Sequence, residues 1–148
     1  MSSDKAGDRT RIVIPSDPMA VRQALCALFE RLMAGQISAD ARDTAQLVLA
    51  EALNNIVEHA YAQSPGEIEV TVELCPGGLT CRIMDAGLPL PGEALPEGRL
   101  APLRAGDALP EGGFGWHLIR SLSQDVNYRR EGERNFLTFR IAAQQYPH

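Results

Sequence analysis

The sequence has few aromatic residues, 5% of its 148 positions, and only three cysteines. An odd cysteine count without regular short spacing argues against a disulfide framework, and no histidine lies near the cysteines at metal-ligand spacing. We therefore expect a reduced, cytoplasmic protein without a structural metal. Hydrophobic residues still make up 45% of the chain, so a mainly aliphatic core is expected.

The chain also lacks an excess of positive charge and a long apolar run. Its formal net charge is −5, and its arginines are dispersed. Binding to phosphates along a nucleic acid needs a basic stripe, so we expect no nucleic-acid partner. No apolar run reaches the length of a membrane span, so we expect no membrane segment. The first ten residues are polar and predict a flexible leader rather than a signal peptide.

The periodicity of the remaining chain predicts a single α+β domain. The expected elements are, in order, a strand at 9–15, helices at 16–35 and 38–61, strands at 67–76 and 79–85, a helix at 114–123 and two strands around Gly132. This order is typical of a two-layer α/β sandwich, in which helices cover one face of a mixed, mainly antiparallel sheet.

The pair Gly77-Gly78 predicts a two-residue hairpin turn between two of these strands. In the register that this turn sets, Leu74 faces Cys81, and the pair is apolar. The same register places Cys75 and Cys81 on opposite faces of the sheet.

The second expected helix carries an unusual set of polar residues in "EALNNIVEHAY". On a wheel of 100° per residue, Glu51 and Asn55 stack one turn apart beside the apolar face, and Glu58 falls on the same side. A carboxylate above an amide carbonyl can bind Mg²⁺, or act as a base beside a phosphate. A solvated face also explains Glu51, but Asn55 lowers helix propensity where Glu, Lys or Arg would serve better.

Asp85 lies at the end of an expected strand, in "IMDAGLP". The strand alternation places it on the apolar face, opposite Val70, where a carboxylate costs free energy unless a donor binds it. Two interpretations remain open: the side chain caps its own turn, or it accepts a hydrogen bond from a buried ligand amine. Gly87, two residues on, would let such a ligand approach the backbone.

Glycines also lead directly into the helix of "GGFGWHLI", at residues 112–119. Such a start offers unpaired N–H groups and the positive end of the helix dipole, which suits a phosphate. It is neither a Walker A loop nor a Rossmann fingerprint. The preceding residues 87–113 have five prolines and no periodic pattern, so they predict a functional loop or lid.

Together, these three signals resemble the motifs of the Bergerat-fold (GHKL) ATPases, and most of all those of the bacterial anti-sigma-factor serine/threonine kinases of partner-switching systems. "EALNNIVEHAY" matches their N-box, "DAGLP" their first glycine box, and "GGFGWHLIRSLSQDVNYRREGERNFLTF" their second glycine box and closing strands. On this basis we expect a leader at 1–10, an ATP-binding kinase domain at 11–143 with an ATP lid at about 88–112, and a tail at 144–148.

The resemblance implies a role for each residue around a bound nucleotide. Glu51 would be the general base, and Asn55 the Mg²⁺ ligand that bridges the phosphates. Asp85 would accept from the adenine amino group, and Gly87 would make room for the base. One departure is the stretch Leu88-Pro89, where many family members have a second glycine.

Other residues of the motifs have implied roles that are less direct. Gly113 and Gly115 would hold the phosphates. Arg104 in the lid would reach the γ-phosphate, or else lie in a solvated loop. Supporting roles are expected for His59 and Tyr61, and packing roles are expected for Trp116 and His117.

The implied function is an ATP- and Mg²⁺-dependent serine/threonine protein kinase that is also an anti-sigma factor. Its substrate would be a STAS-domain antagonist, its second partner would be a sigma factor or another regulator, and a homodimer is typical of the family. One alternative is a nucleotide-binding module that sequesters a partner without phosphoryl transfer. A pure interaction domain with a vestigial pocket is a third option, which the retained Asn55, Asp85 and glycines argue against.

Overall fold

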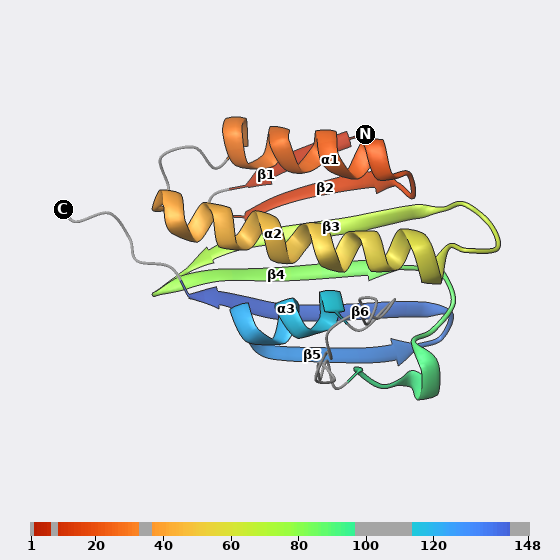
Figure 1. Ribbon diagram of the computed structural model, residues 1–148. Coiled ribbons are helices and arrows are strands. Elements are labelled where there is room, and N and C mark those ends of the chain that lie inside the picture. The colour runs from red at the N-terminus through yellow and green to blue at the C-terminus, as the bar shows by residue number, and fades with distance from the viewer. Residues whose placement is uncertain (1, 7–8, 33–36, 97–113, 143–148) are drawn as a thin grey trace, which may run out of the picture.

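The computed structural model describes residues 2–6, 9–32, 37–96 and 114–142, which form a two-layer α/β sandwich (Figure 1). Its sheet has six strands in the order β1-β2-β3-β4-β6-β5, and every described pairing is antiparallel. The strands are β1 (Ser2–Ala6), β2 (Arg9–Pro15), β3 (Glu67–Cys75), β4 (Gly78–Asp85), β5 (Gln124–Glu131) and β6 (Arg134–Ala142). The α+β sandwich expected from the sequence is confirmed.

The helices all lie on one face of this sheet, with α1 over β1 and β2, and α3 over β5 and β6 (Figure 1). They are α1 (Pro18–Ala27), α2 (Ala39–Asn55), α3 (Phe114–Leu122), the π-helical turns η1 (Leu28–Leu32) and η2 (Ile56–Ala60), and the short 3-10 turn η3 (Pro91–Glu93). The helix predicted to run to Tyr61 therefore ends as an α-helix at Asn55, and η2 continues it.

Local sequence signals set where the first two helices begin. The Asp17 carboxylate accepts a hydrogen bond from the Ala20 N–H at 2.9 Å, and the Ser38 hydroxyl accepts one from the Ala41 N–H at 3.2 Å. These side chains satisfy N–H groups that a helix start leaves unpaired. Asp and Ser are both residue types that favour the N-cap position.

The core lies between the helical layer and the sheet. The inward residues of β6, Leu137, Phe139 and Ile141, are buried, and so are Leu49 and Leu53 of α2. Burial of such aliphatic and aromatic side chains is the main stabilising term of a domain of this size.

The hairpin register predicted from Gly77-Gly78 is wrong by two residues. Leu74 pairs with Leu79 rather than with Cys81, and the turn residues are Pro76 and Gly77. Gly77 has a φ of 76°, which suits the third position of a turn that has proline before it. A shift of two keeps the strand alternation, so Cys75 and Cys81 still lie on opposite faces.

The same shift changes the partner of Asp85, which pairs with Ile68 rather than with the predicted Val70. Gly78 belongs to β4, where a Cβ atom would lie 2.3 Å from the Ile141 carbonyl oxygen of β6. This close approach of β6 is a long-range contact that the hairpin sequence does not contain. It explains why the second glycine is used in the strand and not in the turn.

Residues 2–6 and 9–10, within the segment predicted as a leader, belong to the strands β1 and β2. β1 pairs with β2 from Ser2 opposite Val13 to Ala6 opposite Arg9. A sheet edge offers unpaired backbone N–H and C=O groups, which a polar segment can pair with as readily as an apolar one.

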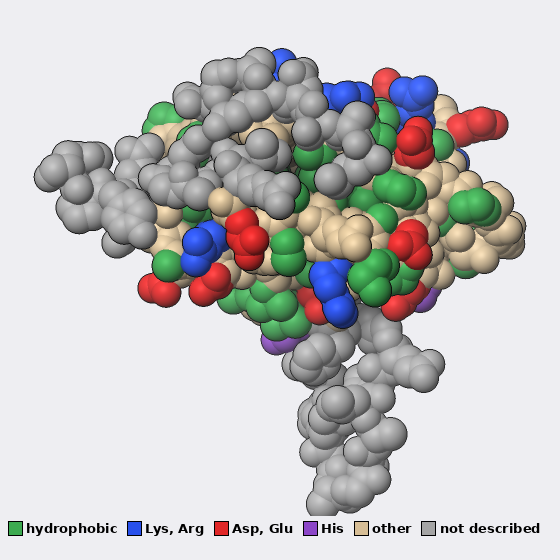
Figure 2. Space-filling model, turned by 90° about the horizontal axis from the view of Figure 1, so that it is seen from above, with side chains coloured by type: hydrophobic (Ala, Val, Ile, Leu, Met, Phe, Trp, Pro, Cys, Tyr) green, Lys and Arg blue, Asp and Glu red, His purple; other side chains and the backbone are tan. Residues whose placement is uncertain are grey.

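The surface shown in Figure 2 has acidic and basic side chains interspersed, with hydrophobic side chains between them. No helix within the described ranges has the length and apolar character needed to cross a membrane.

Candidate functional site

A cavity of about 60 Å³ lies between α2 and η2 on one side and the ends of β4, β5 and β6 on the other. Its polar lining comes from Asn55, His59, Asp85, Tyr128 and Asn135. Its other lining residues are apolar and include Trp116 of α3 and the segment Leu88–Pro91, which we call the strap.

Asp85 is 3% exposed and its carboxylate has two described hydrogen bonds, both to Oδ1. The Gly87 N–H donates at 2.9 Å and Asn135 Nδ2 donates at 2.8 Å. The turn cap expected of a strand-end aspartate is therefore present, but it uses one oxygen. Oδ2 receives no hydrogen bond from the described residues and remains able to accept one from a ligand.

The pKa of Asp85 is raised from its ordinary value because burial disfavours the charged carboxylate. Hydrogen bonds from Asn135 and the Gly87 N–H, and the positive charge of Arg130, act in the opposite direction. Burial thus outweighs the three groups that favour the ionised form.

Asn135 is a site residue that the sequence interpretation missed. It is 4% exposed, and its Oδ1 accepts hydrogen bonds from the Tyr128 hydroxyl at 2.6 Å and from Arg130 Nη1 at 3.1 Å. A signal was available: Asn135 has the same strand parity as the buried Leu137 and Phe139, so it is a polar residue in an apolar series.

Glu51 and Asn55 of α2 both lie next to the first turn of α3. A Cβ atom placed on Gly115 would be 2.7 Å from Glu51 Oε2 and 3.5 Å from Asn55 Nδ2. The missing side chain of Gly115 therefore leaves room for these two polar groups. Sequence reasoning predicted that all three residues belong to one site, and the geometry brings them together.

Asn55 Nδ2 is buried and has no hydrogen-bond partner, and it is the one such side-chain nitrogen or oxygen among the described residues. An unsatisfied buried donor costs free energy, and an oxygen atom of a ligand or of water at this point would offset that cost. If the amide turns over, it presents its oxygen to the same space. This polar group and the nearby Glu51 carboxylate fit a phosphate-bound Mg²⁺, which commonly uses one or two protein ligands.

Gly87 has a different neighbour from the one predicted. A Cβ atom there would lie 2.4 Å from the carbonyl oxygen of Ala60, which accepts a hydrogen bond from the Leu88 N–H at 2.8 Å. Gly87 thus makes room for the end of η2. Its expected role beside a base remains a prediction.

The motif residues with expected supporting or packing roles divide into those that line the cavity and those that do not. His59 and Trp116 line the cavity. Tyr61 instead connects two backbone segments, because its hydroxyl donates to the Glu67 carbonyl at 2.6 Å and accepts from the Ala86 N–H at 2.9 Å. His117 lies 3.5 Å from the Ser121 hydroxyl and does not line the cavity.

Some predicted site residues lie outside the described residues. These are Gly113, Arg104 and the part of the expected lid from residue 97 to residue 112. The described start of the lid is the strap and the residues up to Pro96, whose carbonyl accepts a hydrogen bond from Arg120 Nε at 2.7 Å.

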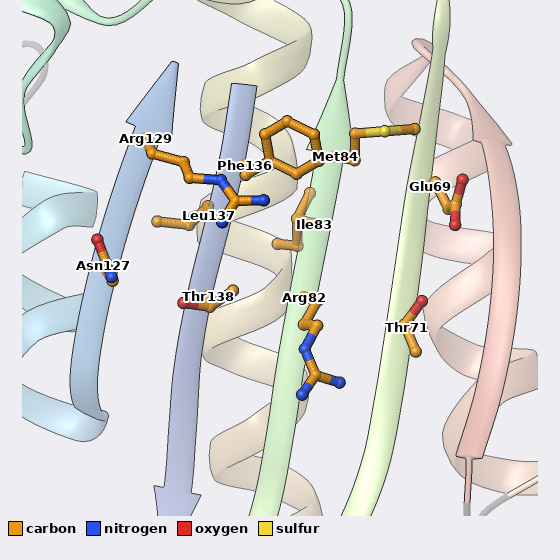
Figure 3. A pocket seen from close by; sticks show the side chains of 10 residues that line it. All are labelled: Glu69, Thr71, Arg82, Ile83, Met84, Asn127, Arg129, Phe136, Leu137 and Thr138. Atoms are coloured by element: carbon orange, nitrogen blue, oxygen red, sulfur yellow. The ribbon is translucent and has the colours of Figure 1, made fainter. Parts of the chain in front are cut away.

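A second hollow, of about 270 Å³, lies on the face of the sheet that the helices leave open (Figure 3). Arg82, Arg129 and Phe136 line it, and the Arg129 guanidinium lies 4.6 Å from the centre of the Phe136 ring. None of the predicted site residues line this hollow, although it is larger than the cavity at Asp85.

The fold and the cavity together define an ATP-binding domain of the GHKL type: an antiparallel sheet covered by helices on one face, with a helix asparagine and a strand-end aspartate lining the same cavity. Residues 14–141 match the family model described as the histidine kinase-like ATPase domain. The chain belongs to this family.

Three proteins have sequences similar to this chain. It is 29% identical over 110 residues to the serine-protein kinase RsbW of Bacillus mycoides, across 72% of this chain and 68% of that protein. It is 30% identical over 104 residues to RsbW of Bacillus cereus, across 68% of this chain and 64% of that kinase. A phytochrome of Mougeotia scalaris is 35% identical over 107 residues, which are 65% of this chain and 9% of the phytochrome.

A solved structure has the same fold. The RsbU and RsbW domains of a Mycobacterium tuberculosis protein align with a TM-score of 0.64 and 16% identity, over 94% of this chain and 33% of that one. The resemblance to the anti-sigma-factor kinases is confirmed by the family model and the RsbW relatives.

Proposed function

We propose that this protein is an ATP- and Mg²⁺-dependent serine/threonine protein kinase that also acts as an anti-sigma factor. The observation that carries the proposal is the convergence of Glu51 and Asn55 on Gly115, next to the cavity that contains Asp85. The RsbW relatives are named serine-protein kinases, which supports transfer to a serine or threonine. Its substrate would be a STAS-domain antagonist, and a sigma factor or another regulator would be its second partner; it would act as a homodimer in the cytoplasm.

The bound nucleotide would supply the γ-phosphoryl group, and its Mg²⁺ would offset the phosphate charge. Asp85 Oδ2 would accept the hydrogen bond of the adenine amino group. Asn55 would bind the metal ion, while the backbone N–H groups at Gly113 and Gly115 would hold phosphate oxygens. Arg104 would add a positive charge near the γ-phosphate.

Glu51 would take the proton from the acceptor hydroxyl as that oxygen bonds to the γ-phosphorus, while the bond from this phosphorus to the bridging oxygen breaks and ADP leaves. Proton removal by a positioned carboxylate contributes to the rate, but most of the catalysis in phosphoryl transfer comes from positioning and electrostatics.

The strap would have to move outward when a nucleotide binds. Ligand clefts usually have volumes of about 300–1,000 Å³, and the cavity at Asp85 measures about 60 Å³. If the strap stayed closed, the small cavity would favour the third option, a pure interaction domain with a vestigial pocket, over both nucleotide-binding functions.

The kinase proposal is tested with Glu51→Gln. This variant should bind MgATP as the parent does, and its transfer of labelled phosphate to a STAS-domain antagonist should fall by roughly 10²–10⁴-fold. The matched control is Glu58→Gln, because Glu58 is exposed and lines a groove with Asn54 and Val57 away from Gly115. Stable binding of the antagonist without any labelling by the parent protein would favour the sequestering module instead.

The nucleotide site is tested separately with Asp85→Ala. Loss of a hydrogen bond to a charged group costs about 1.5–3 kcal/mol, so the Kd for MgATP should rise roughly 10–100-fold. Binding is measured by calorimetry, with Asp43→Ala as the control, since the Asp43 side chain is 73% exposed. Unchanged affinity in Asp85→Ala would show that the adenine assignment is wrong.

A further inference from the structure

Asn135 occupies the position in β6 directly opposite Asp85 in β4. It is almost fully buried, on the same face as Leu137. A buried amide is destabilising unless its donors and acceptor are bound, so the environment of Asn135 must supply partners for both ends of the side chain.

The partners fix which way the amide points. Nδ2 donates to Asp85 Oδ1 at 2.8 Å and to the Leu88 carbonyl at 2.9 Å. Oδ1 accepts from the Tyr128 hydroxyl at 2.6 Å and from Arg130 Nη1 at 3.1 Å. A reversed amide would place its oxygen against two acceptors and its nitrogen against the Arg130 donor, so the orientation is determined by the network.

This network decides what Asp85 presents to the cavity. With the Gly87 N–H and Asn135 Nδ2 both on Oδ1, the carboxylate is held with Oδ2 as its free acceptor. An ionised carboxylate can accept hydrogen bonds but cannot donate one. It therefore matches an amino group on a base and repels a carbonyl oxygen in the same place.

The same side chains also hold the strap. The Asn135 amide binds the Leu88 carbonyl, Arg130 Nη1 donates to the Gly87 carbonyl at 2.7 Å, and the Tyr128 hydroxyl accepts from the Leu90 N–H at 3.1 Å. Tyr128 thus contacts the strap and Asn135 but makes no described hydrogen bond to Asp85. A change at Tyr128 therefore affects the strap without removing a hydrogen bond from the Asp85 carboxylate, whereas a change at Asn135 affects both.

We propose that Asn135 is a positioning residue that sets the base selectivity of the cavity: by binding Asp85 Oδ1 it leaves Oδ2 as a pure acceptor, which selects a purine nucleotide with a 6-amino group over one with a 6-oxo group. The inference rests on the proposed function, because it concerns the base of the nucleotide that this function requires.

The test compares the Kd values of MgATP and MgGTP by calorimetry on the full chain. We expect the parent to prefer MgATP. In Asn135→Leu, Asp85 loses a donor, so the carboxyl takes up a proton more readily and can donate to a 6-oxo group. The ratio of the two affinities should therefore fall by roughly tenfold or more, the effect expected for one hydrogen bond to a charged group. Asn135→Ser, whose hydroxyl can still donate, should restore part of the ratio.

Tyr128→Phe is the matched control. It removes the hydroxyl bound to the strap and to Asn135, but leaves the Asn135 donor on Asp85. Both affinities should change by the same factor, and their ratio should stay at the parent value. Should Asn135→Leu fail to give a cooperative thermal transition, the ratio is measured on Asn135→Ala, which is smaller and places no bulk beside Asp85.

Three results would overturn the inference. An unchanged ratio in the folded Asn135 variants would remove Asn135 from base selection while leaving the proposed function intact. If Tyr128→Phe lowered the ratio of MgATP to MgGTP affinity as much as Asn135→Leu does, the selectivity would depend on the strap and not on Asn135. Failure of the parent to bind either nucleotide would overturn the proposed function and the inference together.

Discussion

Asp85 is the residue at which binding and stability conflict. Its carboxylate is useful to a ligand amine only when it is ionised, but burial raises its pKa and so disfavours that form. A group whose folded pKa lies above its unfolded value binds more protons in the native state across the interval between the two. The free energy of unfolding therefore falls as the pH rises from about 3.8 through the folded pKa.

This conflict predicts that Asp85→Asn stabilises the protein at neutral pH. The amide oxygen can still accept from the Gly87 N–H and from Asn135 Nδ2, but the cost of a buried charge is removed. Urea unfolding at pH 7 should give a higher free energy for the variant, and the difference should shrink as the pH is lowered toward 4. Equal stability across this range would contradict the assignment of burial as the dominant effect.

At the scale of elements, the junction of α2 with η2 and α3 builds the site. After Asn55 the π-helical turn departs from the 100° spacing that the wheel assumed. As a result Glu58 lies in the groove with Asn54 rather than beside Glu51, and Ile56 and Ala60 are only partly buried. His59, next in the same turn, lines the cavity.

The contact between α2 and α3 predicts the effect of Gly115→Ala. The new Cβ would lie within 2.7 Å of Glu51 Oε2, so the carboxylate must move, while the helix itself tolerates alanine better than glycine. Phosphoryl transfer should fall by roughly 100-fold, the cost of a misplacement of about 1 Å, with stability retained. Combining it with Glu51→Gln should add little further loss, because both changes affect the same carboxylate; full additivity would show that they act independently.

At the scale of the whole molecule, β1 is the edge strand next to β2. It contacts the sheet through β2, whereas β4 and β6, which carry Asp85 and Asn135, lie on the far side of β3. Edge strands open more easily than central ones, so the stability of this sheet should not be uniform.

Deletion of residues 1–8 should therefore affect the edge and spare the site. Hydrogen exchange should show faster exchange at the β2 amides that face β1, and unchanged protection in β4 and β6. Arg9 and Arg11 are exposed on β2 and disfavour pairing of the new edge with another molecule, so sedimentation should show no added self-association. Loss of protection throughout β4 would mean that β1 is required for the whole fold.

Much of this protein follows from the sequence alone. Apart from β1, the order of the elements and the inward faces of the strands follow from local patterns with periods of 2 and 3.6, because those patterns depend on neighbours in the chain. The same patterns drew attention to Asn55 and Asp85, since each is a polar residue where the pattern predicts another type, whereas the expected roles of Glu51 and Gly115 came from the resemblance of the motifs.

Only the tertiary structure decided how these parts meet. A slide of two residues leaves the strand alternation intact, so the sequence does not distinguish the register that pairs Asp85 with Ile68 from the one that pairs it with Val70. The choice depends on the approach of β6 to Gly78. The hydrogen bonds of Asn135 likewise connect segments that are up to 50 positions apart, and such contacts exist only after the chain has folded.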